Sequence, residues 1–467
     1  MAVRSKSVSK LTAPAVAVGA WLALGAAASG QTLTDSVTKA VVDHPRVGVV
    51  ANNRLAVESE LRRARGLYYP QVDFRAAVGP EWTNNSSTRA AHGDREFSLV
   101  QKDTQLTIQQ RVFDGLEADS EVTRQKARTE SAARRVRETS EFVGLDAVEA
   151  HVDVVRQRKL VTLAENNVQV HRSLLARIRQ RVAGGAGTVA DVAQTQSRLD
   201  QAMATLAENR GGLAQAEARY ISIVGGAPGQ LADPPFPSSA VPSDVETGVA
   251  NAKDKNPTVS ITESDIRVAD AQVKVADSAF YPKFNLEMTA SRAYNVDGTI
   301  GKATQYNALL VMRWNLYRGG ADLENRRQAL GALAQAKSQR MVALRGSEEE
   351  TRKSFAQLQS ATLRAESLRS AVSLNRDVRD AYVRQFEVGQ RSLLDVLDSE
   401  NELFLSQSRL TSVESERTFA GYRILAVAGE LLPYLGVAMA PEADASRPAM
   451  APTRAYVDSL DTGTVVR

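Results

Sequence analysis

The 467-residue sequence holds few side chains whose types and spacing could perform chemistry. Its four histidines, which lack the spacing of metal ligands, are His44, His92, His151 and His171. It contains no P-loop and no G-x-S-x-G element, and the glycines at 184–187 follow a helical pattern rather than a strand, which indicates a helix–helix turn. The sequence therefore predicts no catalytic constellation, no metal and no cofactor, and hence no enzyme.

Two carboxylates, Asp395 and Asp398, follow the string Gly389-Gln390-Arg391-Ser392-Leu393-Leu394. Taken alone, Asp395 would cap the next helix and Asp398 would be a solvated charge in its first turn. If several chains met at this point, copies of each aspartate would repel one another and attract cations. The residues by themselves favour the capping role.

The first 30 residues have the pattern of a secretory signal peptide. Basic residues up to Lys10 precede an apolar run, Leu11–Ala28, and small residues surround Ser29, so Gln31 is the expected mature N-terminus. A membrane anchor is the alternative, although the run is short for one. No later segment offers about 18 uninterrupted apolar residues, so any crossing of a membrane would use strands closed into a barrel.

Charge and cysteine content restrict the partners. The formal charge is +4, from 58 Lys+Arg against 54 Asp+Glu. Removing the three basic residues of the signal leaves 55 against 54 (58 − 3 = 55), so the mature chain is nearly neutral. That balance argues against nucleic acid as a partner. The absence of cysteine excludes disulfides and an N-terminal cysteine-linked lipid.

An internal repeat organises the chain into residues 31–226 and 244–435, joined by a proline-rich linker at 227–243. Pro45 and Pro70 recur 212 residues later (257 − 45 = 212), whereas Gly115, Gly185, Asp191 and Gly225 recur 204 residues later (319 − 115 = 204). The first copy therefore carries eight extra residues between Pro70 and Phe113 (212 − 204 = 8), as a loop insertion would. The composition of residues 436–467 predicts a disordered C-terminal tail.

Each copy contains a short helical segment, two strands and two longer helices. Period-two alternation predicts hairpins over about 71–113 and 283–317, with strands of about ten residues. Aromatic residues near the strand ends, where an interfacial girdle would lie, are Tyr69, Phe113, Tyr281, Trp314 and Tyr317. Proline-free segments predict helices over 116–182, 189–224, 323–388 and 393–427, and further helical segments cover about 34–66 and 245–279. A hairpin on an ordinary sheet and an ordinary helical bundle are the alternative interpretations.

If the four strands cross a membrane, they cannot close a barrel alone, because known membrane barrels have at least about eight strands. Open edges in lipid would leave backbone groups unpaired. Two chains would give eight strands around a filled interior, and three would give twelve around an aqueous lumen. The long helices of three chains, with two repeats in each, would form a ring wide enough to be hollow, and this favours three chains. The polar faces of the strands, which include Arg75, Glu287 and Arg313, would then line water.

These features resemble the TolC family of outer-membrane efflux and type I secretion proteins over about residues 31–435. The resemblance rests on the turns at His44-Pro45, Asn256-Pro257, Tyr69-Pro70 and Tyr281-Pro282, on the strand exits at 113–115 and 317–320, and on the string Gly389–Asp398. It implies a mixed β-barrel and α-helical coiled-coil barrel, in which a homotrimer shares a 12-stranded transmembrane β-barrel continued by a long periplasmic α-barrel. The expected location is the outer membrane, in contact with its lipid and extending into the periplasm.

The resemblance also implies partners and a gate. Family members dock on inner-membrane ABC, RND or MFS transporters through periplasmic adaptor proteins and export small molecules or proteins. At the periplasmic gate, Asp395 and Asp398 correspond to an acidic ring, Arg391 to a basic residue that ties the inner coiled coil shut, and Asp191 to a residue that pairs across the closed tip. Phe386 stands where the family often has a tyrosine, so the hydrogen bond of that latch would be missing.

Two other classes of protein remain as alternatives. A periplasmic coiled-coil adaptor without a pore would not need four alternating strands with aromatic ends. An enzyme secreted on a helical scaffold would be an active single chain. Heat-modifiable trimers in outer-membrane fractions would exclude both.

Overall fold

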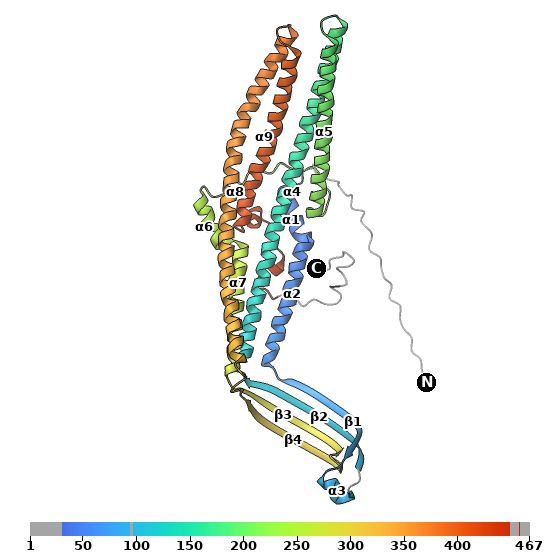
Figure 1. Ribbon diagram of the computed structural model, residues 1–467, viewed down its shortest axis with the longest axis vertical. Helices are drawn as coiled ribbons and strands as arrows, with labels where there is room; N and C mark the ends of the chain where they lie inside the picture. Colours follow the sequence, from blue (N-terminus) through green and yellow to red (C-terminus); the bar gives the residue numbers. More distant parts are fainter. Residues whose placement is uncertain (1–29, 94–96, 449–456, 458–467) are drawn as a thin grey trace, which may run out of the picture.

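The computed structural model describes residues 30–93, 97–448 and 457, which form one elongated body with long helices at one end and a sheet at the other (Figure 1). The predicted signal peptide lies outside the described residues as far as Ser29. Among the helices of the described ranges, none is both long enough and apolar enough to cross a membrane.

The internal repeat is visible in the boundaries of the elements. The first copy begins with α1 (Leu33–Asp43), α2 (Pro45–Arg65) and the 3-10 turn η1 (Gly66–Tyr68). The equivalent elements of the second copy lie 212 residues later and are α6 (Val245–Lys255), α7 (Pro257–Asp277) and η2 (Ser278–Phe280). The long helices recur 204 residues later: α4 (Glu117–Ala183) and α5 (Val189–Val224) match α8 (Ala321–Glu387) and α9 (Leu393–Val427). In Figure 1, α4–α5 and α8–α9 are two antiparallel hairpins lying side by side.

The short helical segment predicted over 34–66 is two helices, because the proline at 45 interrupts it. The residue before a proline avoids the helical region, and His44 has an extended backbone (φ −71°, ψ 128°). Its Nδ1 then accepts a hydrogen bond from the Arg46 backbone N–H at 3.1 Å and caps α2. Asn256 does the same before α7, with Val259 N–H as the donor at 3.1 Å.

The sheet is antiparallel in the order β1-β2-β3-β4. Its strands are β1 (Gln71–Thr83), β2 (Phe97–Phe113), β3 (Lys283–Val296) and β4 (Thr299–Arg313), with 13, 17, 14 and 15 residues. They are longer than the ten residues expected, and β4 ends at Arg313, so residues 314–317 of the predicted hairpin lie beyond it. Directly paired residues share a face. One such row is Phe74, Leu106, Ala290 and Tyr306, and the adjacent row on the other face is Arg75, Gln105, Ser291 and Gln305.

The connections at the far end of the sheet differ between the copies. β3 and β4 are joined by a tight turn at Asp297-Gly298, whereas the segment between β1 and β2 contains a short helix, α3 (Ser86–His92). This helix folds onto the turn: Asn85 Nδ2 donates to the Asp297 carbonyl at 2.9 Å, and a Cβ on Gly298 would lie 2.2 Å from Thr88 Cγ2. The predicted insertion thus covers the turn of the second hairpin.

The passage from the sheet to the long helices is fixed by a close approach. Gly115 has φ +71°, and a Cβ there would lie 2.7 Å from the carbonyl oxygen of Ser278. Glycine alone fits such a position without strain, because the left-handed region disfavours other residues and the space is already filled. This explains the glycine of the Phe113-Asp114-Gly115 sequence at the exit of β2.

A buried polar chain ties the middle of the molecule together. Ser36 Oγ lies 2.8 Å from Tyr220 Oη and 2.9 Å from His151 Nδ1, and His151 Nε2 lies 2.9 Å from the Ala232 carbonyl oxygen. Burial lowers the pKa of His151, which favours the neutral ring. Since the carbonyl can only accept, Nε2 carries the proton, Ser36 donates to Nδ1 and Tyr220 donates to Ser36. The chain links α1, α4 and α5 to the inter-repeat linker.

Glu141 anchors the C-terminal part of the chain to α4. Its side chain is fully buried, and Oε1 accepts a hydrogen bond from the backbone N–H of Leu431 at 2.6 Å, where α10 (Leu431–Leu435) begins. Burial raises the pKa of Glu141 to about 7, although the N–H groups of Leu431 and Leu432 act in the opposite direction.

The tail was expected to be disordered from residue 436 onward, and this is wrong for residues 436–448. Val437 belongs to the main apolar core, and the 3-10 turn η3 (Pro441–Ala443) packs against α4 and α2. The Arg447 carbonyl also accepts a hydrogen bond from the buried Arg54 at 3.4 Å. Apart from Val457, the rest of the tail lies outside the described residues.

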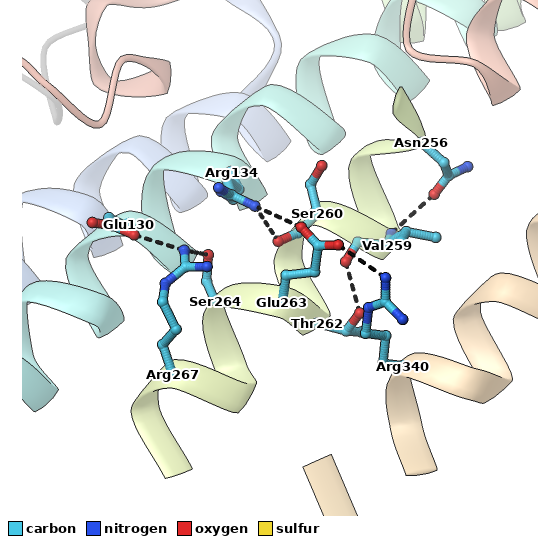
Figure 2. A network of polar contacts seen from close by, with 10 residues as sticks. All are labelled: Glu130, Arg134, Asn256, Val259, Ser260, Thr262, Glu263, Ser264, Arg267 and Arg340. Atoms are coloured by element: carbon cyan, nitrogen blue, oxygen red, sulfur yellow. Dashed lines mark hydrogen bonds and ion pairs between the residues drawn. The ribbon is translucent and has the colours of Figure 1, made fainter. Parts of the chain in front are cut away.

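Helix α7 lies between α4 and α8 and is joined to both by ion pairs (Figure 2). Glu263 bridges Arg134 of α4 at 3.8 Å and Arg340 of α8 at 3.2 Å. Arg267 pairs with Glu130 of α4 at 2.7 Å. Because α7 belongs to the second repeat and α4 to the first, the contacts with Arg134 and Glu130 join the repeats. Helix α2, the counterpart of α7, packs on α4 of its own repeat.

Candidate functional site

Two helix–helix turns form the end of the molecule farthest from the sheet (Figure 1). Gly185 and Gly389 occupy equivalent positions with φ +80° and +79°. The next helices begin at hydroxyl caps: Thr188 accepts from the Asp191 N–H and Ser392 from the Asp395 N–H, each at 3.2 Å. The negative charges of the first-turn aspartates interact favourably with the positive N-terminal end of each helix dipole, which helps to explain why both turns fold alike.

Arg391 lies against its own hairpin. Its guanidinium carbon is 4.2 Å from the centre of the Tyr382 ring, and Nε donates to Gln385 Oε1 at 3.0 Å. Nη1 lies 3.7 Å from the Asp395 carboxylate, which also accepts from Ser392 Oγ at 2.9 Å. The structure therefore brings Arg391 and Asp395 together, and it gives Asp395 a part in the helix cap as well as a cationic neighbour.

Phe386 packs between the two hairpins. It lies against an apolar cluster formed by Leu174, Ile178, Leu393, Val396 and Leu397, which come from α4 and α9. The guanidinium of Arg181 on α4 is 4.6 Å from the centre of the Phe386 ring, and its Nη1 donates to the Phe386 carbonyl at 3.3 Å. Phe386 lacks the hydroxyl of a tyrosine latch, but it holds the hairpins together through a cation–π contact and a backbone acceptor.

Asp398 has a partner that the sequence did not indicate. Its Oδ1 lies 2.8 Å from Arg198 Nη2, and the pair joins α9 to α5. The side chains are 53% and 30% exposed, so the pair is screened by solvent and of modest strength. A second pair between the hairpins joins Arg177 to Glu387 at 3.6 Å. Asp398 is thus compensated within its own chain.

Asp191 stays in its own turn, where Oδ2 accepts from the Thr188 N–H at 2.9 Å. Within the described ranges no hydrogen bond or ion pair joins it to Arg391. Arg181, Arg198 and Tyr382 are the residues that sequence reasoning missed. The contacts of Arg181 and Arg198 depend on the register of one hairpin against the other, which the sequence does not give, whereas Tyr382 contacts Arg391 within its own hairpin. Across the described part of the chain, no three His, Cys, Asp or Glu side chains are grouped closely enough to hold a metal.

Comparison with known proteins decides the family. The model of the outer membrane efflux protein family matches residues 37–226 and 249–430, one segment in each repeat. The chain belongs to the outer membrane efflux protein family. It is accordingly an outer-membrane export channel that extends into the periplasm, rather than a periplasmic adaptor.

Individual proteins agree with this assignment. The chain is 25% identical over 436 residues to the outer membrane efflux protein BepC of Brucella suis biovar 1, covering 91% of each. It is 22% identical over 412 residues to the alkaline protease secretion protein AprF of Pseudomonas aeruginosa, covering 85% of this chain and 84% of that protein. The structure resembles the Campylobacter jejuni CmeC outer membrane channel with a TM-score of 0.76 at 12% identity, covering 85% and 86%. The predicted fold class, a β-barrel continued by a helical tunnel, is confirmed.

Proposed function

We propose that three copies of this chain form one duct that exports small molecules, proteins or both. The observation that carries the proposal is the sheet: it segregates apolar from polar residues, and β1 and β4 are each paired on one side only within the described chain. Unpaired edges cannot remain in lipid, so neighbouring copies must pair β4 with β1. Three copies give about twelve strands, which leave room for a water-filled lumen.

The helices support the same assembly. Helix α7 lies between α4 and α8 of one chain and packs on both. Helix α2, its counterpart in the first repeat, packs on α4 but, within the described residues, not on α8 of the same chain. In a closed ring of repeats, α2 would contact α8 of the adjacent copy as α7 contacts α4. Exposed apolar side chains on α8, which such a contact would cover, include Leu330, Met341 and Val342.

The hairpin tips serve as the gate in this proposal. Arg391, Asp395 and Phe386 belong to the hairpin α8–α9 or its turn, and Asp191 and Arg198 belong to α5. Three chains would place the aspartates around a narrow opening, where their charge attracts cations. The pairs Arg198–Asp398 and Arg177–Glu387, with the contact between Arg181 and Phe386, favour the state in which the two hairpins of each chain are held together. A partner that binds the separated hairpins better would open the duct.

Periplasmic adaptor proteins and inner-membrane ABC, RND or MFS transporters are the partners expected of such a duct, and the chain itself would perform no catalysis. One test is to express the full chain and examine outer-membrane fractions for a heat-modifiable trimer that conducts ions in planar bilayers. A deletion strain, examined for antibiotic sensitivity and for missing secreted proteins, would identify the cargo. A purified mature chain that is monomeric, in water or in membranes, would contradict the proposal.

A further inference from the structure

The apolar face of the sheet carries three cations in two adjacent rows. Lys102, Tyr294 and Lys302 are directly paired across β2, β3 and β4. Arg292 is paired in the next row with Thr104 and Thr304. Since directly opposed residues share a face, the three cations form one cluster on the sheet.

This cluster lies on the side that faces lipid. The row after that of Arg292 is Leu106, Ala290 and Tyr306, continued on β1 by Phe74, and it belongs to the same face because side chains alternate along a strand. Tyr306 is 80% exposed and Phe74 is 72% exposed in the single chain. Residues of this kind form the outer surface of a membrane barrel, so the cations also point outward.

No acidic residue shares that face along β1, β2, β3 or β4 in the described parts of these strands. The strand carboxylates nearest in sequence to these cations, Asp103 and Glu287, point to the opposite face. Lys102 and Lys302 are exposed, and among the described residues neither has an ion-pair partner. Arg292 donates to Tyr294 Oη at 2.6 Å, and its guanidinium carbon lies 5.4 Å from the centre of that ring. The cluster thus carries positive charge without a protein counter-ion.

The height of the cluster matches a lipid headgroup layer. The same face runs from Met312, at the helical end of β4, to Lys302, ten residues away. At about 3.3 Å per residue and a tilt of about 40°, this spans about 25 Å, the height of the apolar band of a membrane barrel. Because the strand turns lie at the end away from the periplasmic helices (Figure 1), the cluster is at the level of the outer leaflet.

We propose that Lys102, Arg292 and Lys302 bind the phosphate groups of a phosphorylated saccharolipid of the lipopolysaccharide type in the outer leaflet. Cations buried in the apolar band would be costly, whereas at its upper edge they can form charge-assisted hydrogen bonds with phosphate. Tyr294 holds the Arg292 guanidinium in place, so the cluster is partly ordered before the lipid binds. This goes beyond export, since it concerns how the barrel is held in its membrane.

The test compares the full-length trimer with K102Q/R292Q/K302Q. Purified protein is titrated in detergent with diphosphorylated lipid A, and binding is measured by native mass spectrometry and by the rise in melting temperature. We expect the triple variant to bind the lipid roughly tenfold or more weakly than the wild type, because each cation near an anionic headgroup contributes to the attraction. Single variants K102Q and K302Q should show smaller losses.

The matched control is R75Q, which removes a cation from the opposite face in the row next to Ala76. It should leave lipid A binding unchanged. Wild-type binding should also weaken when dephosphorylated lipid A replaces the diphosphorylated form, and phosphatidylglycerol or inorganic phosphate should not compete equally. Equal binding by the triple variant, or equal competition by phosphatidylglycerol, would overturn the proposal. Heat-modifiability and conductance of the variants report separately on trimer formation and export.

Discussion

Arg198 on α5 and Asp398 on α9 form an ion pair of 2.8 Å that joins the two helical hairpins of one chain near their tips. The residues come from different repeats and lie 200 positions apart in the sequence. With the neighbouring pair Arg177–Glu387, this contact opposes any movement that separates the hairpins.

Breaking this pair should favour the open state. R198Q and D398N each remove an exposed ion pair, typically about 0.2–1 kcal/mol per chain and up to about 3 kcal/mol over three chains. The fraction of time spent in high-conductance states in planar bilayers should rise several-fold. R210Q is the matched control, since the Arg210–Glu165 pair has the same length of 2.8 Å but lies within one hairpin. An equal effect of R210Q would show that the position of the pair is irrelevant.

Asp395 should contribute more than Asp398 to the affinity of the pore for cations. Asp398 is compensated by Arg198 at 2.8 Å, whereas Asp395 lies 3.7 Å from Arg391. D395A should therefore weaken the block of conductance by divalent or trivalent cations more than D398A does. Single-channel recordings at increasing cation concentration measure this. Unchanged block in the D395A/D398A double variant would remove both residues from the gate.

The repeat predicts a specific contact between copies. Ser131 of α4 bonds to Asp265 of α7 at 2.7 Å, and the equivalent positions in the other repeat are Gln335 of α8 (131 + 204) and Asn53 of α2 (265 − 212). In N53C/Q335C, oxidation should join copies into covalent dimers and trimers on non-reducing gels. The chain has no cysteine of its own, so no background is expected.

The control for this cross-link is N53C/L333C, in which the second cysteine is about 200° around α8. It should give little cross-linking. Equal yields from both double variants would mean that α2 does not contact α8 of the next copy in the way that α7 contacts α4.

Glu141 should make the stability of the protein depend on pH. Its pKa in the folded chain is about 7, above the ordinary 4.5, so the folded state binds more protons between these values. Its stabilising effect is complete below pH 4.5 and is lost as the pH rises to 7, at about 1.4 kcal/mol per unit, or roughly 3 kcal/mol per chain. E141Q should raise the melting temperature at pH 8 and reduce the difference in melting temperature between pH 5 and pH 8.

Thermal unfolding in detergent at these two pH values measures the effect. The matched control is E208Q, which removes an exposed carboxylate from α5 and should leave the pH dependence unchanged. A wild-type slope retained in E141Q would locate the pH dependence elsewhere.

The sequence predicted the repeat, the strand pairs and the turns because each of them leaves a recurring pattern of residue types along the chain. The two offsets locate the glycine turns, and alternation within residues 71–113 and 283–317 separates the two faces of the strands, whereas the helix breaks before Pro45 and Pro257 were not predicted. Strand lengths were underestimated because residues toward the extracellular end, such as Lys102 and Arg292, are polar on the outward face and interrupt the pattern. The ordered part of the tail was missed because its apolar run, Val437–Ala440, is only four residues long, and its packing onto the main core depends on residues distant in the sequence.

The contacts of the proposed gate could be predicted only in part. The contact between Arg391 and Asp395 could be predicted, because the two residues lie four positions apart at one turn. The partners Arg181 and Arg198 depend on how the two hairpins lie against each other, and the repeat does not specify that register. For the same reason the cation–π contact of Phe386 could not be foreseen, although the loss of a tyrosine hydroxyl could.

Helices α4 and α8 both have 67 residues. At about 1.5 Å per residue each extends about 100 Å, so the two hairpins reach the same depth below the membrane. A deletion of one heptad from each of α8 and α9, with α4 and α5 unchanged, would leave alternate hairpins around the mouth about 10 Å too short, and the rim would no longer be level. The length of the duct therefore depends on both repeats, and a longer or shorter duct can evolve only if the helices of both repeats change in length by the same amount.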